Sequence, residues 1–342
     1  MGMKFISYLL KKVKSRPRIF FILLMAIVCL VSIKVHEYVL PLPAENWINS
    51  NLMKIRLKNP DHFSFAVFSN SKDSITIFEN LLKQVDHDSD IAFVLELGDA
   101  VLKGKTPYYR QFINKIETNL GIPFLTVIGD QELTGDGRKL YRKIFGPFYY
   151  SFTAGRQFFI VMDNIHKKGI GPDQMTWLIK ELEKAQRYSN RIIFLHRPLY
   201  EPHTAEKGAF LTGNYSQELF DLFSKYNVTH IFASNTEGFF QRVVKGIHYT
   251  VTGGTGSSHD STGGKYIFSH FLKVNVAQDD IRVEIKEINS AGLIYSHPFR
   301  YRIMTCTGNI LRFHWEELAL FFILLLCMIF FVHDRKKSPG IN

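Results

Sequence analysis

The 342-residue chain contains little cysteine, and little net charge outside its two ends. Of its three cysteines, Cys29 and Cys327 lie in apolar runs, and only Cys306 lies in the part between them. No disulfide can therefore form within that middle part. The formal charge of +11 includes +6 from residues 4–18 and +2 from residues 334–337, which leaves about +3 for the rest. A nearly neutral middle domain has no electrostatic basis for binding nucleic acid, and we predict no nucleic-acid partner.

A phosphate-binding P-loop is also absent from the sequence. The glycine-rich stretch 253–265 ends in Gly264-Lys265, but His259 stands where the motif needs its first glycine, and Tyr266 stands where it needs Ser or Thr. We therefore expect a flexible loop over this stretch.

The long apolar runs lie near the two ends of the chain, and each has basic residues on the side of its own terminus. They predict transmembrane segments at 19–40 and 313–332. The positive-inside tendency then puts the basic tails, 1–18 and 333–342, in the cytoplasm and residues 41–312 outside it. This topology predicts a two-pass protein of the cell membrane or of an endomembrane.

The first apolar run has an alternative interpretation as a cleaved signal peptide, although Leu42-Pro43-Ala44 is a poor cleavage site. Residues 41–312 lie outside the cytoplasm in either case. The second run is not a lipid-anchor signal, because charged residues follow it.

Between the apolar runs, short strand patterns alternate with helical patterns. Strands are predicted at 65–69, 91–97, 124–128, 148–152, 158–162, 192–195, 230–233, 239–244, 248–251, 266–274 and 281–288, and helices at 75–85, 107–120, 174–188 and 216–226. This alternation, with hairpins midway and at the end, predicts an α/β fold of two mixed β-sheets sandwiched together and flanked by helices. Residues 290–312 would form an adapter that leads from this domain to the second transmembrane segment.

Five polar blocks directly follow strands of this pattern. They are Asn70-Ser71-Lys72, Gly98-Asp99, Gly129-Asp130-Gln131-Glu132, Leu195-His196-Arg197-Pro198 and Ser234-Asn235-Thr236-Glu237. Open α/β sheets bind their ligands at the carboxyl ends of the strands. We therefore expect the five blocks to meet at one edge of the sheets.

In their order and placement, the blocks resemble the motifs of calcineurin-like metallophosphoesterases. Those motifs run Asp-x-His, Gly-Asp, Gly-Asn-His-Glu, a lone His and Gly-His-x-His, and the resemblance covers about residues 65–256. In that family two divalent ions, bridged by a carboxylate and a hydroxide, clamp the phosphoryl oxygens and supply the nucleophile. Several of the metal-ligand positions carry other residues here, so the resemblance implies a degenerate centre.

For the first metal, the resemblance implies a degenerate site of Asn70, Lys72 and Glu237 beside the bridging Asp99. Asn70 and Lys72 replace an aspartate and a histidine, so a cationic side chain stands where an imidazole should be. We hypothesise that Lys72 takes the place of the first ion and is held by Asp99 and Glu237.

The second metal pocket would contain Asp99, Asp130, His196 and Asn235. Two carboxylates, an amide and an imidazole suit one Mg²⁺, Mn²⁺ or Ca²⁺ ion better than a zinc ion. Gln131 replaces the histidine that assists the leaving group, and glutamine cannot shuttle a proton at neutral pH. The candidate catalytic residues are therefore His196, Gln131 and Lys72.

These substitutions predict a membrane-anchored member of the family that binds a phosphorylated ligand or a protein partner with little or no hydrolysis. One alternative is an active phosphoesterase, for phosphomonoesters or phosphodiesters, that uses one divalent metal with Lys72 as an electrophilic partner. A second alternative is a structural module that spaces the two membrane segments.

Overall fold

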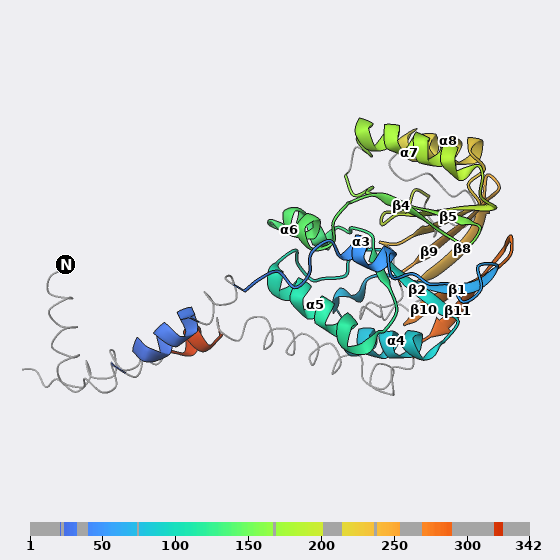
Figure 1. Ribbon diagram of the computed structural model, residues 1–342. Coiled ribbons are helices and arrows are strands. Elements are labelled where there is room, and N and C mark those ends of the chain that lie inside the picture. Colours follow the sequence, from blue (N-terminus) through green and yellow to red (C-terminus); the bar gives the residue numbers. More distant parts are fainter. Residues whose placement is uncertain are drawn as a thin grey trace, which may run out of the picture. The chain divides into compact units, whose positions relative to one another are not determined.

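The structure is a computed structural model of the chain, drawn in Figure 1. It describes residues 21, 24–32, 40–73, 75–166, 169–200, 214–235, 238–253, 269–288 and 318–323. The chain divides into two compact units. One unit is Leu42–Tyr301, and the other combines Met1–Pro41 with Arg302–Asn342.

Two mixed sheets form the centre of the unit Leu42–Tyr301. The first has five strands in the order β11-β10-β1-β2-β3, in which β1, β2 and β3 are parallel and β10 and β11 form an antiparallel hairpin. Its strands are β1 (His62–Phe68), β2 (Ile91–Glu96), β3 (Phe124–Thr126), β10 (His270–Ala277) and β11 (Asp280–Glu287). The parallel strands align their carboxyl ends at one edge of this sheet.

The second sheet has six strands in the order β4-β5-β6-β7-β9-β8. Its four central strands are parallel, and β4 and β8 pair antiparallel at the two edges. The strands are β4 (Tyr150–Ala154), β5 (Gln157–Val161), β6 (Asn190–Phe194), β7 (His230–Ala233), β8 (Phe239–Val244) and β9 (Ile247–Thr252). The predicted sandwich of two mixed sheets is confirmed.

Helices cover the outer face of each sheet. Figure 1 shows α4 (Ile75–His87) and α5 (Thr106–Asn119) against the first sheet, and α7 (Pro172–Ala185) and α8 (Asn214–Lys225) against the second. The pattern predicted these four helices, but it missed α3 (Trp47–Leu52) and α6 (Gly137–Ile144), which have only six and eight residues. Helices this short have too few turns for a clear apolar periodicity.

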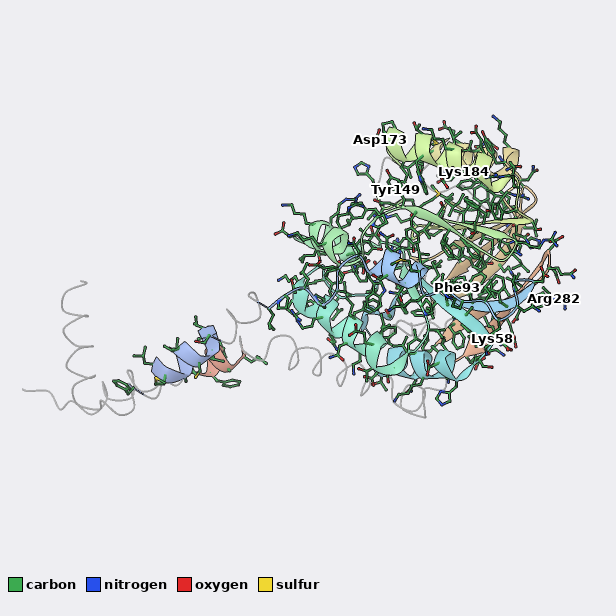
Figure 2. All side chains as sticks on the ribbon, viewed as in Figure 1. Lys58, Phe93, Tyr149, Asp173, Lys184 and Arg282 are labelled. Carbon is green, nitrogen blue, oxygen red and sulfur yellow. The ribbon has the colours of Figure 1, made fainter. Side chains whose placement is uncertain are left out.

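The core between the two sheets is built from phenylalanine rings. Phe65 of β1 stacks on Phe93 of β2 with centroids 5.2 Å apart and meets Phe159 of β5 edge-on at 5.4 Å. In Figure 2, Phe93 lies inside the domain, whereas Lys184 and Arg282 lie on its outer surface. Burying each ring contributes about 1.5–3 kcal/mol to the free energy of unfolding, relative to leaving it exposed. This aromatic layer therefore holds the two sheets together.

Much of what the sequence predicts for the two ends lies outside the described residues. Among the residues that the structure describes, no helix has the length and apolar character needed to cross a bilayer. Described residues within the predicted spans are 21, 24–32, 40 and 318–323, and those at 24–32 and 318–323 are helical. The tails 1–18 and 333–342, the adapter 290–312 and most of the glycine-rich stretch are not described, so these assignments stay predictions.

Candidate functional site

The polar blocks meet where the carboxyl ends of strands from the two sheets come together. Asn70, after β1, donates its backbone N–H to the carbonyl of Gly98, after β2, at 3.2 Å. Gln131, after β3, donates its backbone N–H to Oδ1 of Asp99 at 3.0 Å. In the second sheet, Ser234 donates its N–H to the carbonyl of His196 at 2.9 Å. Glu237, in the fifth block, lies outside the described residues.

Two glycines allow these loops to approach each other. Gly98 has a φ of 91°, and a Cβ added there would lie 2.6 Å from Nδ1 of His196. At Gly129 an added Cβ would lie 2.3 Å from the backbone nitrogen of Asp99. Any side chain at either position would push the loops apart.

Three of the site's polar residues have left-handed backbones. The φ angles are 58° at Asn70, 60° at Asp99 and 59° at Asn235. Such angles cost about 1–2 kcal/mol for most residues, although Asn and Asp tolerate them best. The surrounding hydrogen bonds therefore hold these turns in place against backbone strain.

Lys72 forms an ion pair with the buried Asp99, its Nζ contacting Oδ2 of the carboxylate. The backbone N–H of Lys72 also donates to the carbonyl of Asp99, at 3.2 Å. Burial alone would raise the pKa of Asp99, but the positive charge that His196 has when it is protonated, and the Lys72 ammonium, outweigh burial, and the pKa lies below its usual value. The carboxylate of Asp99 therefore carries its negative charge against the ammonium group of Lys72.

His196 is fully buried between the two sheets. Its Nδ1 lies 2.7 Å from the carbonyl oxygen of Leu97, so this nitrogen carries the donated proton. Its Nε2 lies 3.5 Å from Oδ1 of Asp99 and 3.9 Å from Oδ2 of Asp130, and it has no hydrogen-bond partner among the described residues. Burial lowers the pKa of the imidazole, and Asp99 opposes that effect.

Asn164 positions the loop that carries His196. Its Oδ1 accepts the backbone N–H of His196 at 3.1 Å and that of Arg197 at 3.0 Å. Its Nδ2 donates to the carbonyl of Arg197 at 2.7 Å. Sequence reasoning missed Asn164, although it comes just after the predicted strand at 158–162, in the same position relative to its strand as the five blocks have to theirs.

Arg197 belongs to the fourth polar block, but no role was predicted for it from the sequence. Its Nη2 donates to Oδ1 of Asp130 at 2.6 Å, and its Nε donates to Oδ2 at 3.2 Å. Nδ2 of Asn235 also donates to Oδ2 of Asp130, at 3.3 Å. Asp130 therefore lies near both His196 and Asn235, but it pairs with a guanidinium, and the Asn235 amide directs an N–H group at it.

Glu132 joins the loops that follow β2 and β3. Its carboxylate accepts four backbone N–H groups, at 2.8–3.2 Å, from Gly129, Asp99, Ala100 and Val101. Burial, and then the charge of Asp99, raise the pKa of Glu132 to about 7. Glu132 is thus a positioning residue that sets where the Asp99 side chain lies.

These residues do not fit a two-metal centre. Within the described parts of the chain, no three or more His, Cys, Asp or Glu side chains are arranged to hold a metal ion. Asp99 and Asp130 already have cationic partners in Lys72 and Arg197. The bare Nε2 of His196, facing two carboxylates, is a feature that favours a further cation.

No protein-family model matches the chain, but solved structures share its fold. The purple acid phosphatase PPD1 from yellow lupin (Lupinus luteus) has a TM-score of 0.54 and 17% identity, with 69% of this chain and 53% of that chain covered. This chain thus spans about half the length of the lupin protein.

Two further structures match more of their own length. GAP50, the anchor in the inner membrane complex of Plasmodium, has a TM-score of 0.54 and 16% identity, covering 68% of this chain and 87% of that chain. A dimetal phosphatase from Danio rerio has a TM-score of 0.53 and 12% identity, covering 66% of this chain and 96% of that chain. The unit Leu42–Tyr301 therefore has the fold of the calcineurin-like metallophosphoesterases.

Proposed function

We propose that this chain is a membrane-anchored protein of the metallophosphoesterase fold that acts by binding and not by hydrolysis. The observation that carries the proposal is the ion pair between Lys72 and Asp99. Asp99 stands where the family has its bridging carboxylate, and an ammonium group at that carboxylate takes the space and the charge of the first ion. Without that ion the two-metal clamp on a phosphoryl group cannot assemble.

The proton donor of the family is missing as well. Gln131 replaces the histidine that would protonate the leaving group, and its backbone N–H is used to hold Asp99. General acid–base help is typically worth about 10²–10⁴-fold in rate. Losing it together with the first ion supports binding without turnover.

A phosphorylated ligand is the binding partner that the site chemistry supports best. The side chains of Lys72 and Arg197 are 21% and 26% exposed. A guanidinium has five N–H donors and an ammonium has three, so both groups keep donors beyond those given to Asp99 and Asp130. Phosphate oxygens accept such charge-assisted hydrogen bonds. If the site does not bind phosphate, the alternative is a protein partner that carries none.

Membrane anchoring rests on the two apolar runs and their basic flanks. The described helical residues of these runs expose several large apolar side chains: Leu24, Met25, Val28, Val31, Leu320, Phe321 and Phe322. Exposed apolar side chains in such number mark contact with lipid or with another apolar surface. The existence of a membrane-complex anchor with this fold, GAP50, is compatible with the same role here.

The topology can be tested with single cysteines in a variant that lacks the three native ones. A membrane-impermeant maleimide should label Lys139→Cys in intact cells, since the Lys139 side chain is 84% exposed. It should label Ser338→Cys only after lysis. Labelling of both before lysis would contradict the two-pass topology, whereas labelling of neither would place the domain in the lumen of an endomembrane.

A second candidate function is a phosphoesterase with a single metal ion. It is favoured by the unpartnered Nε2 of His196, which faces one oxygen of Asp99 and one of Asp130. The repulsion among three such acceptors would be relieved by a cation, either a proton or a metal ion.

One experiment on the detergent-purified full-length protein separates the two candidates. The protein is equilibrated with Mn²⁺, desalted and assayed for metal content, for hydrolysis of p-nitrophenyl phosphate and its diester, and for binding of phosphoserine. We expect much less than one ion per chain, no hydrolysis, and binding of phosphoserine. One retained ion that is lost in His196→Ala, together with hydrolysis, would establish the second candidate, and two ions would refute the role of Lys72.

A further inference from the structure

Arg197 forms a two-point contact with a carboxylate that the family resemblance assigned to the second metal. The guanidinium presents Nη2 and Nε to the two oxygens of Asp130, at 2.6 and 3.2 Å. This bidentate arrangement matches the planar fork of arginine to the planar carboxylate and is the most specific form of such a pair. Asp130 therefore has both oxygens engaged before any ion is considered.

The surrounding backbone holds Arg197 in this position. Asn164 accepts the backbone N–H of Arg197 at 3.0 Å and donates to its carbonyl at 2.7 Å. Asn235, from the next strand of the sheet, donates to the same carboxylate at 3.3 Å. The side chains of Arg197 and Asp130 are only 26% and 27% exposed. The pair is thus built into two loops and differs from an incidental surface ion pair.

Among the described residues of the site, each carboxylate of the candidate metal pockets has a cationic side chain as its partner. Asp99 faces Lys72, and Asp130 faces Arg197. Glu132 is satisfied by four backbone N–H groups and needs no cation. A divalent ion at the oxygens of Asp99 and Asp130 would lie within a few ångströms of two side-chain cations, and such repulsion is strong in a partly buried site.

We infer that Lys72 and Arg197 together replace the two metal ions of the fold, so that side-chain cations hold the site loops in the way that a dimetal centre would. The second pocket is then a latent metal site that Arg197 closes. This inference concerns how the site is held together, and it stands whether or not the domain binds a phosphorylated ligand.

The substitution Arg197→Met tests the inference, since methionine has a similar length and no charge. It removes the guanidinium from Asp130 and leaves Asp99, Asp130 and His196 as three possible metal ligands, which would have to shift toward one another to hold an ion. Binding of Mn²⁺ to the folded state raises the melting temperature by mass action. For the full-length protein in detergent we expect a rise of about 4 °C or more in millimolar Mn²⁺, with one ion retained after desalting.

The parent protein gives a test that needs no variant to fold. Neither millimolar Mn²⁺ nor EDTA should change its melting temperature by more than about 1 °C, because no ion binds the closed site. A fall with EDTA, or a rise with Mn²⁺, would overturn the inference.

Arg138→Met is the matched control, because Nη2 of Arg138 contacts Oδ2 of Asp163 at the same distance of 2.6 Å and neither residue is a candidate metal ligand. We expect this variant to show no Mn²⁺ response. Arg197→Lys, which keeps the charge, should behave like the parent protein. If Arg197→Met responds to Mn²⁺ no more than Arg138→Met does, Arg197 does not close a metal site and the inference is wrong.

Discussion

The carboxylate of Glu132 accepts the backbone N–H of Asp99 at 3.0 Å, although the two residues follow different strands. The same oxygen accepts the N–H of Gly129 at 2.8 Å, and the other oxygen accepts those of Ala100 and Val101. One buried carboxylate therefore sets the relative position of the loops after β2 and β3. The Lys72–Asp99 ion pair depends on this arrangement.

Glu132→Gln should destabilise the domain. The amide keeps one acceptor oxygen and turns an NH₂ group toward backbone N–H groups, so two of the four donors lose their acceptor. An unsatisfied buried donor costs about 1–3 kcal/mol, so for two donors we expect the free energy of unfolding to fall by about 2–6 kcal/mol in a denaturant titration. Glu183→Gln, at an exposed position of α7, should stay within about 0.5 kcal/mol of the parent. Equal stability of the two variants would show that Glu132 does not organise the loops.

Gly129→Ala should disrupt the same arrangement by steric contact. The added Cβ would lie 2.3 Å from the nitrogen of Asp99 and 2.6 Å from Oε2 of Glu132. Overpacking of this kind typically costs about 1–3 kcal/mol. At Gly121 the closest atom to an added Cβ, Oδ1 of Asp86, is 3.5 Å away, so Gly121→Ala is the control. Thermal unfolding compares the melting temperatures of the two variants. If that of Gly129→Ala is no lower than that of Gly121→Ala, the predicted steric clash at Gly129 is wrong.

Gln131→His should not restore hydrolysis. The change supplies the missing imidazole, but Lys72 and Arg197 still occupy Asp99 and Asp130. A general acid accelerates a reaction only where the rest of the catalytic site is assembled. We therefore expect no release of p-nitrophenol above the parent rate, with or without Mn²⁺. A gain of about tenfold or more, abolished by His196→Ala in the same background, would instead support the one-metal phosphoesterase.

His230 should make stability depend on pH. Burial, followed by the charge of the stacked His248, lowers the pKa of His230 to about 4. The unfolded chain, with a pKa of about 6.5, binds this proton first as the pH falls. The contribution of His230 to the free energy of unfolding is therefore complete above about pH 6.5. It is lost progressively toward pH 4, and the loss is about 2 kcal/mol at pH 5.

Denaturant titrations at pH 7 and pH 5 can isolate this effect. Between these values the parent should lose about 2 kcal/mol more of its unfolding free energy than His230→Gln does. The carboxylates that also titrate in this range are common to both proteins, so they cancel in the difference. Parallel losses would show that His230 is not buried in its neutral form.

Much of the fold could be predicted from local patterns. Apolar strands such as β2 and amphipathic helices such as α4 show their periodicity within a few residues, so their order followed from the sequence. The order of strands within each sheet did not. The placement of β9 between β7 and β8, for example, depends on long-range packing that no local pattern encodes.

For the site, the sequence by itself determined which side chains follow which strands. That was enough to bring together Lys72, Asp99 and Asp130, because β1, β2 and β3 are parallel and their carboxyl ends share one edge of the first sheet. His196 follows β6 of the second sheet, so its place beside them depends on how the two sheets pack. Only the tertiary structure decided how they pair. Asp130 and Arg197 are 67 residues apart, and whether their charges meet depends on the relative position of two sheets and on loops held by Asn164 and Glu132. The chain therefore specified the charges of the site, and the packing of the sheets decided that cationic side chains would neutralise its carboxylates.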